Sequence, residues 1–220
     1  MKRKRIRKSR ILILLIVIFV VTFFGAILYK KSVQNSSVYS YDGIDDTYQF
    51  LIEKDGDSFL HIIKVYANNK AYLIPFRYGP KELEDIPLDT NAKKDFLYND
   101  KGLKKDLYIT QDPSLPDKTD QESILAIVEI NRITGQAVWG IYNIPTHSSF
   151  TEETPRANEI NLSIKDCKDV NNDIGVVKFT LGDSNRIYID DNGCVILQAK
   201  EGDDIFKVAD KMAMHLLGVF

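Results

Sequence analysis

The sequence predicts an α+β protein: an N-terminal transmembrane helix followed by an exported domain of antiparallel strands with two main packed helices. Three observations support this prediction. A long apolar run stands near the N-terminus, short β-branched and aromatic runs alternate with turn residues further on, and two longer segments repeat apolar residues with helical spacing. We expect four parts: a basic cytoplasmic tail (1–10), a transmembrane helix (11–29), a stalk (30–46) and an exported domain (47–220).

The apolar run extends over 18 residues from Ile11 to Leu28, and Thr22 is its one polar member. At about 1.5 Å per helical residue it reaches the minimum length for crossing a hydrocarbon core of about 30 Å. Seven cations precede the run, whereas Lys30 and Lys31 follow it. This asymmetry predicts a single-pass cell-membrane protein with a cytoplasmic N-terminus and its C-terminal domain outside, held in the lipid bilayer by the run.

A cleaved signal peptide is the alternative interpretation, because it also combines a basic start with an apolar centre. The apolar core of a signal peptide has about 7 to 15 residues and ends at an A-x-A-like site. Here the run is longer and ends in Gly25-Ala26-Ile27-Leu28, which matches that site poorly. An uncleaved anchor is therefore the better prediction.

The remainder of the chain, about 185 residues, has the size of one ordinary domain. Residues 11–220 contain 22 basic and 31 acidic residues, a net charge of −9. So acidic an exported domain argues against nucleic acid as a partner. The basic tail is explained by topology and by attraction to anionic lipid.

The chain has two cysteines, Cys167 and Cys194, and both follow the predicted anchor. In an oxidising compartment they permit one pairing, so we expect a disulfide. The alternative is two small buried residues that never meet. Asn35 and Asn161 each begin an N-x-[ST] pattern, which marks a glycosylation acceptor where exported proteins are glycosylated.

The exported domain begins with an expected meander of three strands, because Asp55-Gly56-Asp57 and Asn68-Asn69 are turn sequences between β-forming runs. A further strand is expected at 107–110, another at 137–144, and a polar loop at 146–161. The last unit is expected to be a second meander, in which Asn192-Gly193 is a strong hairpin signal. The strands expected in these two meanders are 48–52, 59–65, 71–76, 175–181, 186–189 and 194–198.

Two helices are expected to pack on these strands. The first begins at a capping box formed by Thr119 and Glu122, runs to Thr134 and stops at Gly135. Apolar residues cover most of its circumference, so we expect it to be sandwiched. The second runs from a cap at Asp203 or Asp204 to 217, with an apolar stripe at 205, 208, 209, 212 and 216. We expect 207, 210, 211 and 214 to lie on its solvent-exposed side.

Three short runs carry a resemblance: LIPFRYGP at 73–80, IYNIP at 141–145, and Ala209-Asp210 followed by Leu216-Leu217-Gly218. They resemble uncharacterised archaeal proteins that have a single N-terminal membrane anchor and an exported domain. The resemblance covers most of the exported part and implies an archaeal cell envelope. No activity is known for those proteins, so it assigns no catalytic residue.

Three histidines are candidates for chemistry. His61 lies in an expected strand and His215 near the end of the last helix, which are structural positions. His147 stands beside two serines and close to Glu152 and Glu153, so it is the one place where a nucleophile, a base and a carboxylate crowd together. Neighbours in sequence rarely form a triad, which is defined by geometry, and a loop without catalytic function is the better interpretation.

Two further candidates have weaker patterns. Asp169, Asn171 and Asp173 have the spacing of the first calcium-loop ligands, but the required glycine is displaced to position 175 and the twelfth position, 180, is a threonine. A solvated turn is the better interpretation. Glu129 is either a buried acid with a raised pKa or, as we prefer, a residue at the exposed edge of its helix near Arg132.

The sequence shows no glycine-rich phosphate loop, no HExxH, no CxxC and no G-x-S-x-G, so it indicates no cofactor, no metal and no class of enzyme. The leading prediction is a membrane-anchored extracytoplasmic interaction or accessory domain of the cell envelope with a protein partner. The alternative is an envelope hydrolase that uses His147. We expect the contact surface on the strand side, around Trp139, Tyr142 and Phe150.

Overall fold

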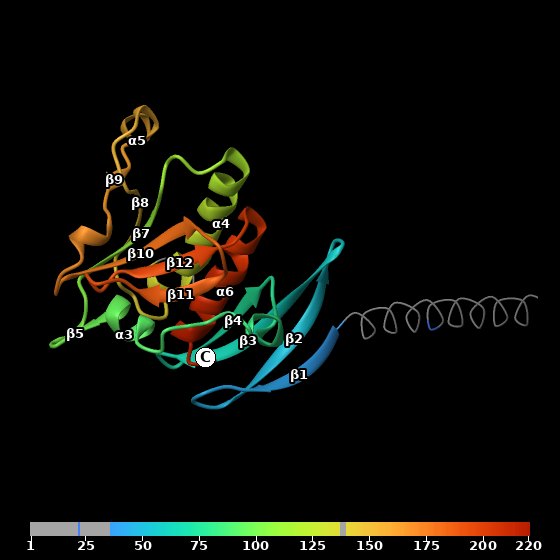
Figure 1. The fold of residues 1–220 in the computed structure, drawn as a ribbon. Helices are drawn as coiled ribbons and strands as arrows, with labels where there is room; N and C mark the ends of the chain where they lie inside the picture. Colours follow the sequence, from blue (N-terminus) through green and yellow to red (C-terminus); the bar gives the residue numbers. More distant parts are fainter. Residues whose placement is uncertain (1–21, 23–35, 137–139) are drawn as a thin grey trace, which may run out of the picture.

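The computed structural model describes residues 36–136 and 140–220, together with Thr22. The predicted transmembrane helix at 11–29 lies outside these ranges apart from Thr22, and no helix among the described residues is long and apolar enough to cross a bilayer. Within the described ranges the chain is α+β, as predicted, with two main sheets and helices packed between them (Figure 1).

The first of these, which we call the N-terminal sheet, is antiparallel and follows the chain in the order β1-β2-β3-β4. Its strands are β1 (Ser36–Asp42), β2 (Thr47–Asp55), β3 (Ser58–Ala67) and β4 (Lys70–Phe76). The three predicted strands are confirmed. Gly56, Asn68 and Asn69 have positive φ angles, as tight hairpin turns require.

Strand β1 lies within the segment that we predicted to be a stalk, 30–46. The stretch Val38-Tyr39-Ser40-Tyr41 alternates in the manner of a strand, and Tyr39 and Tyr41 pack against the core. This alternating stretch is short and is flanked by polar residues, so its sequence resembles that of a linker. The predicted stalk therefore contains a strand of the N-terminal sheet from Ser36 to Asp42.

The second sheet, the C-terminal sheet, has the order β11-β12-β10-β7-β8-β9. Its strands are β7 (Asp106–Gln111), β8 (Thr146–Phe150), β9 (Ser163–Ile164), β10 (Ile174–Leu181), β11 (Arg186–Ile189) and β12 (Val195–Ala199). All neighbours in it are parallel except β11 and β12. The expected second meander is therefore wrong: β12 lies between β10 and β11, so only the Asn192-Gly193 turn closes a hairpin.

The segment between α4 and β9 also differs from the prediction. Residues 140–144 form a bend rather than a strand, and 137–139 lie outside the described ranges. The expected polar loop at 146–161 instead contains β8 and the short helix α5 (Pro155–Glu159). The sequence of β8, Thr-His-Ser-Ser-Phe, has too few apolar residues to show a strand pattern.

The two main helices are α4 (Asp117–Thr134) and α6 (Ile205–Leu216), and they pack against one another. Helix α4 begins two residues before the predicted cap, after Pro116, and ends as predicted at Gly135. The smaller elements are α2 (Pro80–Leu83), α3 (Ala92–Leu97), β5 (Tyr98–Asn99), β6 (Gly102–Leu103) and the 3₁₀ turns η1 (Cys167–Asp169) and η2 (Gly202–Asp204).

Helix α6 lies between the two sheets (Figure 1), and the side that we expected to face solvent is buried there. Asp210, Lys211 and Met214 are all at most 4 % exposed. The Asp210 carboxylate accepts hydrogen bonds from the backbone N–H groups of Arg77 and Tyr78, 2.9 and 3.0 Å away. Arg77 and Tyr78 directly follow β4, so the N-terminal sheet covers the polar side of α6.

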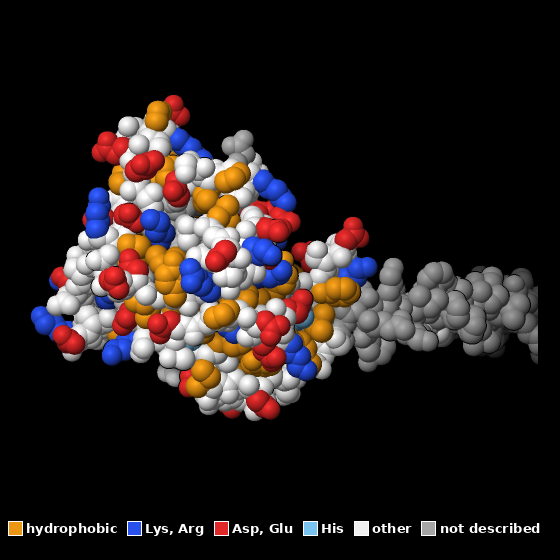
Figure 2. Space-filling model, viewed as in Figure 1, with side chains coloured by type: hydrophobic (Ala, Val, Ile, Leu, Met, Phe, Trp, Pro, Cys, Tyr) orange, Lys and Arg blue, Asp and Glu red, His pale blue; other side chains and the backbone are white. Residues whose placement is uncertain are grey.

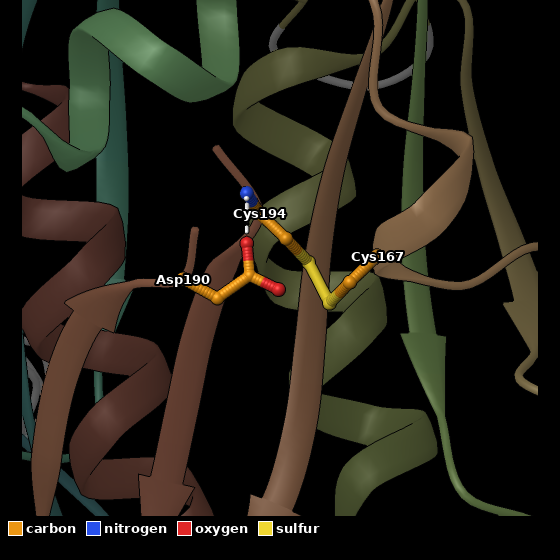
Figure 3. A group of neighbouring side chains, drawn as sticks. All are labelled: Cys167, Asp190 and Cys194. Atoms are coloured by element: carbon orange, nitrogen blue, oxygen red, sulfur yellow. Dashed lines mark hydrogen bonds between the residues drawn. A yellow bond between two sulfur atoms is a disulfide. The ribbon is translucent and has the colours of Figure 1, made fainter. Parts of the chain in front are cut away.

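The predicted disulfide between Cys167 and Cys194 is confirmed, with Cα atoms 5.1 Å apart. It joins η1 to the start of β12 (Figure 3). With Val176 and Ile196 the two cysteines form a small second core. The Asp190 carboxylate lies beside it and accepts a hydrogen bond of 2.9 Å from the Cys194 backbone N–H. Because both sulfur atoms are covalently paired, this cluster has no thiolate to offer a metal.

Candidate functional site

His147 lies in strand β8 and not in a loop. Its Nε2 is 3.4 Å from Asp106 Oδ1, and its ring stacks on Tyr108 with centroids 5.1 Å apart. Successive side chains alternate across a strand, so Ser148 points to the opposite face and Ser149 to the same face. Ser149 is 1 % exposed, and its hydroxyl has no hydrogen-bond partner among the described residues. The serine that shares the histidine's face is therefore buried, and no hydrogen bond joins its hydroxyl to His147.

The calcium-loop candidates form a hydrogen-bonded turn. Asp169 accepts from the Asp166 backbone N–H at 2.8 Å, and Asn171 accepts from the backbone N–H groups of Asp173 and Ile174. Asp173 pairs with Lys105, whose ammonium is 2.9 Å away. The oxygens that a calcium ion needs are thus turned toward the protein's own donors, which is the arrangement of the turn that we preferred.

Glu129 is more buried than a residue at the exposed edge of its helix, which is the position that we preferred from the sequence. Its side chain is 26 % exposed and pairs with Arg77 at 3.3 Å, while its second oxygen has no partner among the described residues. Burial raises the pKa of Glu129, although Arg77 and Arg132 act in the opposite direction. Burial and the nearby Glu129 also raise the pKa of Asp210 well above its ordinary value. Both acids contact Arg77, which donates to Asp210 through its backbone N–H and to Glu129 through its Nε.

Of the expected contact surface around Trp139, Tyr142 and Phe150, the structure describes Tyr142 and Phe150, and both are largely buried. The hydroxyl of Tyr142 donates to the Leu216 carbonyl oxygen, and its ring packs against the core. Phe150 is 3 % exposed. Trp139 lies outside the described ranges. These aromatic residues therefore serve the fold wherever the structure describes them.

An exposed apolar surface lies instead on helix α4. The helix buries one side, including Ala126, Ile130 and Ile133, in the main core. On its other side Ile124, Leu125 and Val128 are between 38 % and 51 % exposed. Figure 2 shows apolar side chains gathered over α4, amid acidic and basic groups that are intermingled elsewhere on this face. The expectation that α4 is sandwiched is therefore wrong for the isolated chain.

A groove of about 150 Å³ runs along this side of α4, and we call it the α4 groove. One wall is the helix, and the other is the α5 arm, residues 151–164, which projects beside α4 in Figure 1. The lining is mostly apolar and comprises Gln111, Ile124, Ile127, Val128, Ser148, Ser149, Phe150, Arg156, Ile160 and Leu162. It lies near the carboxyl ends of β7 and β8, which is the edge where ligands bind in open parallel sheets.

A polar network holds the two walls of the groove together. Asp120, in the first turns of α4, accepts from Gln111 Nε2 at 2.5 Å and from Arg156 Nη1 at 2.6 Å. Ser123 donates to the carbonyl oxygen of the Gln111 side chain. Asp120 is only 10 % exposed at its side chain, so the pairing is largely shielded from water. The network fixes the α5 arm at a defined distance from the helix.

Arg156 also places a positive group at the rim of the groove. Its side chain is 49 % exposed, and its guanidinium lies 5.5 Å from the centre of the Phe150 ring. Ile160, at 57 % exposure, extends the apolar rim on the same arm. Next to it, the sequon residue Asn161 is exposed in a turn with φ of 51°. The mouth of the groove thus combines apolar side chains with one cation.

Comparison of the chain with protein-family models, with curated proteins and with solved structures finds no match. The α4 groove therefore stands on its geometry alone.

Proposed function

We propose that the chain is a membrane-anchored interaction domain that works outside the cytoplasm, and that its α4 groove binds an apolar side chain of a protein partner in the cell envelope. The observation that carries the proposal is the groove itself. It is a preformed apolar channel whose walls are held by the Asp120 network rather than by mutual packing. Such exposed apolar surfaces are typical of binding sites.

Two features support the location. The run from Ile11 to Leu28 and the cations before it have the composition of a signal anchor. The disulfide between Cys167 and Cys194 is suited to an oxidising compartment on the far side of the membrane. The resemblance to archaeal anchored proteins agrees with both, so we place the domain at the outer face of the cell membrane.

The size and chemistry of the groove favour a protein segment as the occupant. A volume of about 150 Å³ accepts one medium-sized apolar side chain and is small for an extended lipid or an intact cofactor. The guanidinium of Arg156 at the rim can pair with a carboxylate of the same segment. Because the walls are preformed, little ordering entropy is lost on binding.

The geometry lends no support to a hydrolase built on His147. Its ring contacts Asp106 and Tyr108, and it is not among the described residues that line the α4 groove. The serine on its face is buried. An interaction domain is therefore the better supported of the two classes.

Site-specific photocrosslinking tests the proposal in the full chain. Benzoylphenylalanine replaces Ile160, at the rim of the groove, and in a matched control it replaces Leu103, an exposed apolar residue of β6. We expect the Ile160 probe to capture one defined envelope protein in intact cells, and the Leu103 probe to capture none. The substitution Val128→Asp, at an exposed position, should abolish capture while changing stability by less than about 0.5 kcal/mol. Equal capture from both positions would refute the proposal.

A further inference from the structure

The N-terminal sheet has an apolar outer face. Side chains of Phe50, Ile63 and Ile74 point inward and are at most 1 % exposed, so the alternate residues of each strand point outward. The outward residues include a continuous cross-strand row. In the register of the sheet, the members of this row pair in the order Val38, Leu51, Ile62 and Pro75.

The neighbouring rows extend the apolar character. Leu73 pairs with Lys64, and Tyr66 pairs with Ala71. Leu73, Tyr66 and Val38 are between 60 % and 73 % exposed. We call the surface formed by these eight residues the outer sheet face. Large exposed apolar patches of this kind mark contact surfaces in monomeric folds.

We propose that a second copy of the chain covers the outer sheet face, with a two-fold axis parallel to the strands and midway between β2 and β3. Two sheets pack face to face at about 10 Å with their strands roughly aligned. This axis keeps each row at its own height and exchanges β1 with β4 and β2 with β3. Leu51 of one copy then lies opposite Ile62 of the other, and Val38 lies opposite Pro75.

The charges of the face agree with this pairing. Lys64 lies one row from Leu51 and Ile62, on β3, and the exchanged position on β2 is Gln49. Glu53, on the other side of the apolar row, meets the position of Leu60. No like charges are brought together among these residues. A bilayer is a poorer occupant, because an anionic surface is recognised by clusters of cations, and Glu53 accompanies the single Lys64.

The membrane anchor strengthens association of the two copies, and this step rests on the proposed membrane anchoring. Four strands about 4.8 Å apart and about seven residues long give a flat area of about 450 Å² per copy, so both copies bury about 900 Å². That is below the range of stable specific interfaces and typical of weak ones. Confinement to one membrane raises the effective concentration of the two copies and compensates for the small area.

The geometry of the two-fold axis also suits two anchors in one membrane. Rotation about an axis along the strands leaves both copies of Ser36, the first residue of β1, at the same end of the dimer. The seven residues between Leu28 and Ser36 span at most about 28 Å. Both chains can therefore enter the same bilayer from one side.

Thiol crosslinking of the full chain in its membrane tests the proposal. The natural cysteines are bridged, so Ile62→Cys supplies the only free thiol, close to the proposed axis. A short bis-maleimide should give a covalent dimer at least tenfold above the yield from Leu103→Cys, an exposed position elsewhere. Adding Val38→Glu, at 65 % exposure and therefore harmless to the fold, should remove the dimer. Equal yields from Ile62→Cys and Leu103→Cys would overturn the proposal.

Two further measurements distinguish failure of the dimer proposal from failure of the proposed membrane anchor. In the first, a fluorescent dye is attached to Ile62→Cys in membranes that contain brominated lipid. Quenching of the dye without a crosslinked dimer would show that the bilayer covers the face, and it would overturn the second copy as occupant. Release of the chain from membranes by alkaline carbonate would refute the anchor, whereas the crosslink yield before extraction still decides about the dimer. Partner capture at Ile160 is measured in a different variant, so the groove and the outer sheet face can fail independently.

Discussion

Reduction of the disulfide between Cys167 and Cys194 should destabilise the domain by about 3.6 kcal/mol. The bridge joins residues separated by 27 positions. In the chain-entropy model a closed loop of this length lowers the entropy of the unfolded chain by about 12 cal/mol/K, which is about 3.6 kcal/mol at 25 °C. The folded state should lose little, because Cys194 is fully buried and remains packed against Val176 and Ile196.

Urea unfolding of a fragment that starts at Ser36, with and without a phosphine reductant, measures this difference. The matched control is the double variant Cys167→Ala and Cys194→Ala, whose unfolding should not respond to the reductant. Protein taken from the envelope should also contain no alkylatable thiol before reduction. A loss below about 1 kcal/mol on reduction, or two reactive thiols in the native protein, would refute this reasoning.

Two other substitutions test the interior. Burial lowers the pKa of Lys211 to about 8 from 10.5, so the unfolded chain binds more protons between these values and stability rises with pH across them. Lys211→Met should remove that rise in stability, which amounts to about 3 kcal/mol, and should stabilise the domain at pH 7. Urea titrations at pH 7, 9 and 10.5 in which the stabilities of the natural chain and the variant change in parallel would contradict this. A Cβ at Gly175 would lie 2.1 Å from the Phe96 carbonyl oxygen, so Gly175→Ala should cost about 1 to 3 kcal/mol, and an unchanged melting temperature would show that α3 can move.

The N-terminal sheet could be predicted because its signals are local. Turn residues at Gly56 and Asn68 connect strands that pair with their neighbours in sequence, so pattern and pairing agree. The order of the C-terminal sheet depends on which strand inserts beside β10, and both β11 and β12 have suitable apolar residues. That choice is made by packing of β12 against α6, a contact between distant segments that no short sequence window contains.

The burial of charged residues on α6 shows the same limit of prediction from local sequence. Asp210 and Lys211 are polar, and in an isolated amphipathic helix they would face water. Their partners are the backbone of Arg77 and the ring of Phe220, which come from other elements. Sequence periodicity reports which side of a helix is more apolar, but it does not report whether a second layer supplies hydrogen bonds to the other side.

Helix α4 presents the opposite case, and it bears on function. Its apolar residues surround most of its circumference, which predicts burial on all sides, yet Ile124, Leu125 and Val128 are exposed in the chain alone. The fold covers one side of the helix, and the α5 arm covers only part of the other. About half of each of these side chains is still exposed, so only part of the roughly 1.5 to 3 kcal/mol that full burial of such a side chain contributes is realised in the chain alone. On the proposed function, the sequence pattern describes α4 in its complex, where the partner supplies the missing wall of the groove.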